Sequence, residues 1–276
     1  MFSFRDKITL GNVFLAADAD GTLLTDDKRV LDKDKAAIRE LCDKGGLFTI
    51  ATGRGVTYAR PIAEEFGLEI PAVIFNGAAV YDFNKDRFLW QCSLSPTARE
   101  HMLMFVERFP SLGIEILCGY EVYVIAANRR TEDHIKLTDV APTRCSLDDI
   151  PLDNWTKVLL EDEPEVIDEL VKFAGNSSIS DLHLVRSGPC YYEMLPFGIN
   201  KGTALGILMD IANIKDRCIV AVGDYMNDIE MLRMADVKIA VANAEDMVKA
   251  EAELIVCDNN SGAAYEIVEW LKGAAR

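Results

Sequence analysis

The stretch VFLAADADGTLL, residues 13–24, decides the fold, because a short apolar run leads directly into a turn that contains two aspartates and a glycine. Residues 13–17 are continuously apolar, which is typical of a strand buried in a parallel sheet. Asp18 and Asp20 follow, and an extended chain points alternate side chains the same way, so both carboxylates can reach one pocket. Gly21 lets the chain turn sharply afterwards. One carboxylate can attack phosphorus while the other handles a proton, although an ordinary aspartate-rich turn predicts a similar string.

The sequence on both sides of this stretch alternates between predicted strands and helices. Up to residue 76 the pattern predicts strands at 47–51 and 72–75, with helices after Asp32 and ending near Gly67. Near the C-terminus it predicts a helix after Lys201, strands at 219–222, 237–240 and 254–256, and helices at 228–234 and 263–271. This alternation predicts an α/β fold with a doubly wound parallel sheet, in which ligands bind beyond the carboxyl ends of the strands.

The pattern changes between residues 82 and 187. Here we expect helices at 96–109 and 163–174 and strands at 121–126 and 155–160, which indicates an inserted α+β module. The expected division is therefore residues 1–82 and 188–276 for the catalytic core and residues 83–187 for the insertion. The two connections between them can act as hinges over the site.

Composition narrows the possible partners and location. The chain has 276 residues, of which 50% are hydrophobic, so its length and composition predict a globular protein of two modules. Its net charge of −16 argues against nucleic acid and anionic membranes as partners. Its seven cysteines form no Cys-x-x-Cys pair, which favours reduced thiols. The chain also lacks an apolar signal-peptide core or a run of about 18 apolar residues, so we expect a cytoplasmic protein.

Two further strings have side chains suited to binding phosphate. In Thr52-Gly53-Arg54 a hydroxyl and backbone N–H groups at a helix start can hold a phosphoryl oxygen, although a helix cap predicts a similar string. In Lys201-Gly202-Thr203 a cation opposes the positive end of the helix dipole. A bound phosphoryl group would compensate that unfavourable charge, whereas a solvated surface lysine is the alternative.

The fourth string is Gly223-Asp224-Tyr225-Met226-Asn227-Asp228, directly after the predicted strand 219–222. Its carboxylates are the oxygen ligands that Mg²⁺ prefers, and Asp228 can also cap the following helix. All four strings fall at predicted carboxyl ends of parallel strands or at a helix N-terminus. Together they predict a single site.

In this order the four strings resemble the four motifs of the haloacid dehalogenase superfamily, specifically its Cof-type phosphatases with a large α+β cap. The resemblance covers essentially the whole chain, and it is supported by Asn76-Gly77-Ala78, by residues 198–204, by Asn243-Ala244 and by residues 258–262. One departure is Val241-Ala242, where the family more often has methionine and glycine, and we expect only local backbone consequences. The resemblance implies a Rossmann-like core with the insertion as a cap that sets substrate specificity.

The resemblance also implies a role for each site residue. Asp18 is then the nucleophile that forms an aspartyl-phosphate, and Asp20 protonates the leaving group and later activates water. Phosphate is held by Thr52, Gly53, Lys201 and Asn227. The cofactor implied is Mg²⁺, bound by the Asp18 carboxylate, the Asp20 backbone carbonyl and Asp224. Asp228, with Asn227, orients these ligands from behind.

The implied function is magnesium-dependent hydrolysis of small phosphate monoesters, with sugar phosphates first and phosphorylated cofactors next, by a monomer or small homo-oligomer. The alternatives are a phosphomutase or phosphotransferase that uses the same aspartate pair, or a non-catalytic phosphate-sensing protein. A mutase would require a bisphosphate activator. The sequence does not rank the substrate-contacting candidates in the cap, which are Arg144, Arg186, Tyr120, Tyr123, Tyr191 and Tyr192. The three histidines, His101, His134 and His183, lack metal-ligand spacing and are expected to be surface or satisfied buried residues.

Overall fold

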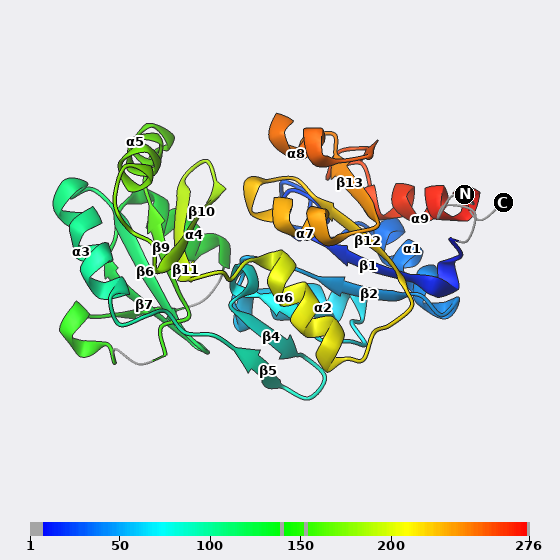
Figure 1. Cartoon of the computed structure of the whole chain (residues 1–276), viewed down its shortest axis with the longest axis horizontal. Coiled ribbons are helices and arrows are strands. Elements are labelled where there is room, and N and C mark those ends of the chain that lie inside the picture. Colours follow the sequence, from blue (N-terminus) through cyan, green and yellow to red (C-terminus); the bar gives the residue numbers. More distant parts are fainter. Residues whose placement is uncertain (1–7, 139–140, 152–153, 275–276) are drawn as a thin grey trace.

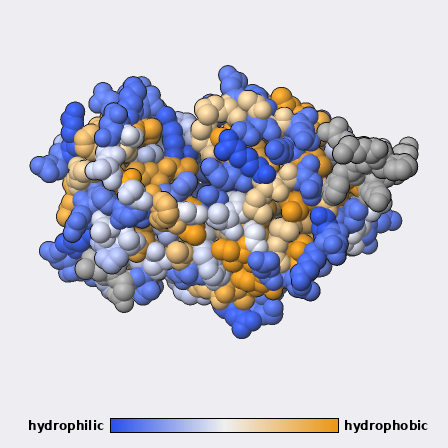
Figure 2. Space-filling model, viewed as in Figure 1, coloured by the Kyte–Doolittle hydropathy of each residue, from blue (hydrophilic) through white to orange (hydrophobic). Residues whose placement is uncertain are grey.

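The computed structural model describes residues 8–138, 141–151 and 154–274, and these form two lobes side by side (Figure 1). Hydrophilic residues cover much of the face seen in Figure 2. Among the described residues there is no helix with the length and apolar character needed to cross a membrane.

The core lobe contains a five-stranded sheet in the order β14-β13-β12-β1-β2, and every neighbouring pair is parallel. The central strand β1 is buried along its whole length, as its continuous apolar sequence predicts. The strands are β1 (Val13–Ala17), β2 (Leu47–Ile50), β12 (Cys218–Gly223), β13 (Val237–Val241) and β14 (Leu254–Val256).

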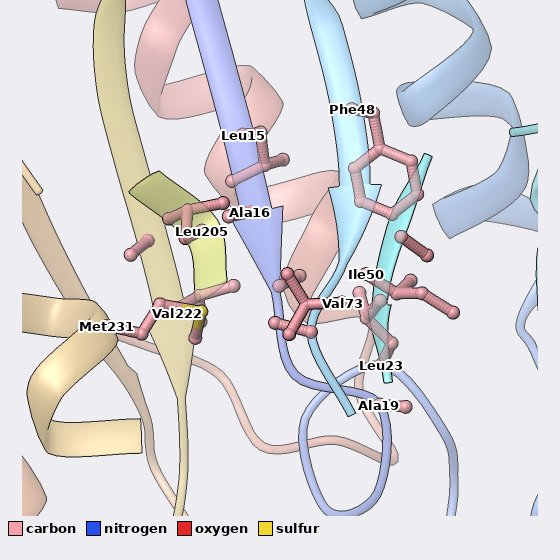
Figure 3. Packing of buried hydrophobic residues seen from close by; sticks show 14 of the residues in the cluster. Leu15, Ala16, Ala19, Leu23, Phe48, Ile50, Val73, Leu205, Val222 and Met231 are labelled. Carbon is pink, nitrogen blue, oxygen red and sulfur yellow. The ribbon is translucent and has the colours of Figure 1, made fainter. Parts of the chain in front are cut away.

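Helices cover both faces of this sheet, α6 and α7 packing together on one side and α1 and α9 on the other (Figure 1). In Figure 3 the side chains of Leu15, Val222 and Leu205 meet beside β1 and β12, and those of Phe48 and Ile50 lie along β2. The helices of this lobe are α1 (Asp32–Asp43), α2 (Val56–Phe66), α6 (Lys201–Ile211), α7 (Ile229–Met234), α8 (Asp246–Glu251) and α9 (Ala263–Ala274).

A small antiparallel sheet, β3-β4-β5, lies beside β2, linked to it by a bridge between Ala51 and Val73. Its strands are β3 (Ala72–Ile74), β4 (Ala79–Asp82) and β5 (Arg87–Gln91). The turn between β3 and β4 presses against the start of α6. A Cβ at Gly77, where φ is +107°, would lie 2.2 Å from the Asn200 carbonyl oxygen, so only glycine fits there.

The second lobe, hereafter the cap, contains a six-stranded sheet in the order β10-β11-β9-β6-β7-β8. Helices α3 and α5 pack on one face of this sheet and bury an apolar cluster of their own. The elements are α3 (Ala98–Arg108), β6 (Gly113–Cys118), β7 (Glu121–Ala126), α4 (Arg129–Thr138), β8 (Thr143–Arg144), β9 (Lys157–Glu161), α5 (Pro164–Gly175), β10 (Leu182–Gly188) and β11 (Tyr191–Pro196).

The predicted α/β fold with a parallel core sheet and an additional α+β module is confirmed. The exact division at residues 83–187 remains a prediction. The predicted division separates two strands from the strands they pair with. It assigns β5 to the insertion, although β5 pairs with β4 of the core lobe. It assigns β11 to the core, although β11 pairs with β9 and β10 of the cap. The chain therefore returns to the core lobe after β11, just before α6.

Candidate active site

The residues of the four sequence strings gather at the carboxyl ends of β1 and β12, beside the start of α6. A cavity of about 300 Å³ opens there, between the core lobe and the cap. Among the predicted site residues, Asp18, Asp20, Gly53, Asp224 and Asn227 line this cavity. Thr52, Lys201 and Asp228 are buried just behind it, at 1%, 1% and 0% exposure.

Asp18 directly follows the central strand, and its backbone N–H donates to the Val222 carbonyl at 3.0 Å, so the parallel ladder fixes its position. Its side chain is buried, and one carboxylate oxygen contacts the Lys201 ammonium. Burial raises the pKa of Asp18 to about 7, against the lowering effect of Lys201. Asp18 therefore points at the cavity from a rigid strand end.

Lys201 is the first residue of α6, and its ammonium is fully buried between two carboxylates. Besides Asp18 it contacts the Asp228 carboxylate at 2.6 Å. Burial lowers the pKa of Lys201, but the attraction of the two carboxylates outweighs it and the net pKa is raised. These carboxylates compensate the unfavourable position of a cation at a helix N-terminus, so the solvated-lysine alternative is excluded.

Asp228 holds the loop after β12. One of its oxygens accepts from Lys201, and the other accepts the backbone N–H groups of Asp224 at 2.9 Å and Tyr225 at 3.1 Å. It makes no side-chain cap bond to α7. Because both oxygens are engaged, Asp228 is suited to orient the site from behind.

Asp224 completes an acidic cluster. Its Oδ1 accepts from the Thr22 hydroxyl at 3.1 Å, and burial together with Asp18 and Asp228 raises the pKa of Asp224 to about 9. Ligand oxygens of Asp18, Asp224 and Asp228 lie within 4.8 Å of one another. The part of the chain that the structure describes offers no hydrogen bond to Oδ2 of Asp18 or of Asp224.

This cluster fits a divalent cation. Three carboxylates face the single ammonium of Lys201, and such a buried excess of negative charge needs a cation or protons. Space also matters, because a Cβ at Gly21, where φ is +77°, would lie 2.3 Å from Asp224 Oδ2. The acidic cluster is therefore consistent with the predicted Mg²⁺ site, with oxygens of Asp18 and Asp224 available to bind it.

Asp20 is turned toward basic side chains. Its carboxylate accepts from Arg54 Nε at 2.7 Å and Nη2 at 2.8 Å, and from Lys28 Nζ at 2.7 Å. Burial acts to raise the pKa of Asp20, but these two cations outweigh it and the pKa falls below its usual range. Asp20 is therefore ionised in this arrangement. The sequence string contained Arg54, but it did not predict that the arginine binds the second aspartate.

The Thr52 string forms a loop rather than a helix cap. Helix α2 begins at Val56 after Gly55, and the Thr52 hydroxyl instead accepts the N–H of Arg54 at 3.1 Å. Asn227 on the opposite side donates to Asn76 Oδ1 at 2.9 Å, so it is tied to the loop after β3.

The cap supplies cavity residues that the sequence did not single out. From its sheet and from α4, Lys157, Glu193 and His134 reach the cavity, and Tyr58 joins them from α2. Lys157 donates to the Gly53 carbonyl at 2.8 Å and pairs with Glu193 at 3.1 Å, while Asn76 donates to Glu193 at 2.7 Å. The cap is thus bonded directly to the predicted phosphate loop.

Of the cap residues that the sequence left unranked, Tyr191 lines the cavity. Arg144 instead pairs with Glu132, and Arg186 pairs with Asp168. The expectation of a satisfied buried or surface histidine describes His101, which pairs with Asp181. His134 also has partners, Glu115 and Glu161, and it lines the cavity as well. Sequence spacing does not distinguish the residues that line the cavity from those paired elsewhere. Only the neighbours of each residue in the folded structure do so.

The model of the haloacid dehalogenase-like hydrolase family matches residues 15–268. The chain belongs to this family. The resemblance seen in the four strings is therefore confirmed, and the protein is a hydrolase of the haloacid dehalogenase type.

Curated relatives cover nearly the same length. A 5-amino-6-(5-phospho-D-ribitylamino)uracil phosphatase from Bacillus subtilis (strain 168) is 29% identical over 261 residues, which are 93% of this chain and 95% of that protein. An HMP-PP phosphatase from Serratia proteamaculans (strain 568) is 28% identical over 269 residues, with 93% and 94% covered. A crystal structure of a haloacid dehalogenase-like hydrolase from Bacteroides thetaiotaomicron shares the fold, with a TM-score of 0.80 at 21% identity, covering 94% of this chain and 98% of that one.

Proposed function

We propose that this protein is a magnesium-dependent phosphatase of small phosphate monoesters that acts through an aspartyl-phosphate on Asp18. The observation that carries the proposal is the buried cluster of Asp18, Lys201, Asp224 and Asp228, in which Asp18 and Asp224 line one cavity. Membership of the hydrolase family and the phosphatase names of the two curated relatives support it.

Asp18 supplies the nucleophile. Its carboxylate oxygen attacks phosphorus in line with the departing alcohol oxygen, so that an O–P bond forms as the ester O–P bond breaks. The Lys201 ammonium, in contact with Asp18, reduces the repulsion between the carboxylate and the anionic phosphoryl group. The hydroxyl of Thr52, the backbone N–H of Gly53 and the amide of Asn227 are proposed to hold the phosphoryl oxygens.

The acidic cluster would hold Mg²⁺ through Asp18, Asp224 and the backbone carbonyl of Asp20. When bound, the ion supplies positive charge that neutralises the carboxylates and the transferring phosphoryl group. Asp228 has no oxygen left for the ion, because Lys201 and two backbone N–H groups occupy both. Its proposed role is to orient Lys201 and the Asp224 loop.

Asp20 is proposed to exchange the proton of the leaving group. To donate a proton it must first leave Arg54 and Lys28, because both cations keep the carboxylate ionised. Once freed, the carboxylate takes up a proton from solvent and passes it to the departing alkoxide. It regains a proton from the water that cleaves the aspartyl-phosphate. The Arg54 contact thus describes a resting position of Asp20.

The substrate class stays broad at this point. Sugar phosphates remain the leading class, followed by phosphorylated cofactors. The two curated relatives are named as phosphatases of 5-amino-6-(5-phospho-D-ribitylamino)uracil and of HMP-PP. We also retain the predictions of a cytoplasmic location and of a monomer or small homo-oligomer. The net charge of −16 supports the further prediction that nucleic acid and anionic membranes are not partners.

Phosphate release from a panel of sugar, nucleotide and cofactor phosphates, with and without Mg²⁺, tests the proposal. Release should require Mg²⁺, stop with EDTA and disappear in Asp18→Asn. The exposed Asp210→Asn on α6 is the matched control and should retain activity. Turnover that persists in Asp18→Asn would refute the nucleophile. Turnover that appears only with a bisphosphate activator would instead favour the phosphomutase, and binding of phosphate without turnover would favour the sensor.

A further inference from the structure

The two faces of the cap sheet differ in chemistry. Because side chains alternate along a strand, Ile114, Ile116, Val158 and Leu160 point to α3 and α5 and form the apolar cluster. The residues between and beside them point the other way, toward the core lobe. On β6, β9 and β11 this second face carries Glu115, Leu117, Lys157, Leu159, Glu161, Tyr191 and Glu193.

The face of the cap sheet toward the core lobe buries two carboxylates that the stability of the fold does not require. Glu115 and Glu161 are both 0% exposed, on adjacent strands of the sheet. Within the described residues, the polar neighbours of Glu161 are the Thr131 hydroxyl and the His134 ring, and Glu115 Oε2 has no hydrogen-bond partner. Two carboxylates buried side by side with so few donors cost folding free energy, which suggests that the pair is kept for function.

His134 faces the carboxylate pair. Its Nδ1 lies 3.0 Å from Glu115 Oε1 and 3.5 Å from Glu161 Oε1. Burial acts to lower the pKa of His134, but the two carboxylates outweigh it and the net pKa is raised, with Lys157 opposing them. Burial and Glu115 together raise the pKa of Glu161 to about 7. The pair therefore favours an imidazolium, which has N–H donors on both ring nitrogens.

The imidazole ring is close to two other aromatic rings. Its centroid is 6.2 Å from that of Tyr58 on α2 and 5.6 Å from that of Tyr191 on β11. All three rings line the cavity together with Leu117 and Leu159, opposite Asp18 and Asp224. Flat aromatic and apolar walls are suited to a flat ligand, because planar rings stack on them or meet them edge to face.

We propose that His134, supported by Glu115 and Glu161, is a specificity-determining residue that donates a hydrogen bond to the leaving group of the substrate. The leaving group that fits carries a planar ring with a carbonyl oxygen or ring nitrogen as acceptor, whereas a small polyol without a ring lacks this contact. The inference rests on the proposed phosphatase function and adds the chemical class of the ester. The phosphoryl group then lies at Asp18, and the ring lies against the wall formed by Tyr58, His134 and Tyr191.

Two other polar groups near His134, Lys157 and Tyr191, make different interactions. Lys157 is engaged by Glu193 and by the Gly53 carbonyl, so it fixes the cap against the phosphate loop. Burial and Glu161 raise the pKa of the Tyr191 phenol, so it stays neutral and keeps its O–H donor. His134 differs from Tyr191 because its two carboxylate neighbours favour a positively charged donor.

The test compares kcat and KM of wild type, His134→Phe and His134→Gln on two ring esters, pyridoxal phosphate and flavin mononucleotide, and on glycerol 3-phosphate. His134→Phe keeps a ring but removes the donor, whereas His134→Gln retains an uncharged donor. We expect the ratio of kcat/KM for ring esters to that for glycerol 3-phosphate to fall about 10-fold or more in His134→Phe, mainly through KM, and less in His134→Gln. His101→Phe on α3, away from the cavity, is the matched control and should leave the ratio unchanged.

A second measurement follows the carboxylates. In Glu161→Gln the pKa of His134 should fall, because one carboxylate is lost, so KM for ring esters should begin to rise at lower pH than in wild type. An unchanged ratio in His134→Phe, or an unchanged pH profile in Glu161→Gln, would overturn the inference. So would one equivalent of divalent metal that persists in Asp224→Asn but is lost in Glu161→Gln, because the triad would then be a metal site. Hydrolysis of glycerol 3-phosphate by wild type shows independently whether the proposed phosphatase function stands.

Discussion

Replacement of Glu161 by glutamine should stabilise the protein increasingly as the pH rises. Glu161 is 0% exposed, and its pKa is raised from 4.5 to about 7 by burial and by Glu115. The folded state therefore holds this proton more tightly than the unfolded chain does. The associated stability is complete below about pH 4.5 and is lost as the pH rises to about 7, where folding must bury a charge. Glutamine has nearly the same shape and never ionises.

The magnitude follows from the shift. Raising the pKa from 4.5 to about 7 corresponds to roughly 3 kcal/mol in full, most of which develops between about pH 5 and pH 8. The free energy of unfolding, from urea titrations at both pH values, should thus change in favour of Glu161→Gln by about 2 to 3 kcal/mol across this interval. Glu121→Gln, exposed on β7 of the same sheet, controls for the chemical change. A difference between Glu161→Gln and wild type that is the same at both pH values would refute the reasoning.

Three further predictions concern single side chains. Gly77→Ala should lower the free energy of unfolding in urea by more than about 3 kcal/mol, because its Cβ would meet the Asn200 carbonyl at 2.2 Å. Gly67→Ala, where φ is +62° and the space is open, should lower it by only about 1 to 2 kcal/mol. Equal losses would contradict the steric argument. Lys157→Met should lower kcat/KM for phosphate release about 10-fold or more, because the Gly53 carbonyl and Glu193 lose their partner, while the exposed Lys85→Met should retain wild-type kinetics. Asp228→Asn should lower kcat/KM about 10- to 100-fold, since Lys201 loses a charged partner, and wild-type kinetics in this variant would show that Asp228 does not orient Lys201.

The core lobe could be predicted closely because its strands are buried on both faces. Strand β1 occupies residues 13–17 as expected, and α1 begins at Asp32 and ends before Gly45-Gly46. In the cap the signal is weaker, because its strands have two different faces. Strand β6, with Glu115 among apolar residues, and the polar helix α4 were not predicted. Tertiary packing, which the sequence pattern does not report, stabilises both.

Some features of the candidate site could be predicted from the sequence and others could not. Asp18, Lys201 and Asp224 could be chosen from sequence, because each lies directly at the end of a strand or the start of a helix, where backbone geometry aims it at the ligand. The pairing of Asp20 with Arg54 could not, since a side-chain rotamer decides it. The structure also shows that the Lys201 charge is balanced by two carboxylates rather than by solvent.

The sequence by itself determined the fold class, the family and the four strings that meet at one sheet edge. Local patterns suffice for this, because the carboxyl ends of parallel strands converge whatever lies elsewhere in the chain. Only the tertiary structure decided which cap residues face them. Glu115, His134 and Glu161 come from two strands and a helix, and the pairing of β6 with β9 and the packing of α4 bring them together. Sequence spacing does not predict the contact between His134 and the two glutamates, because sheet register and helix packing depend on the whole buried surface.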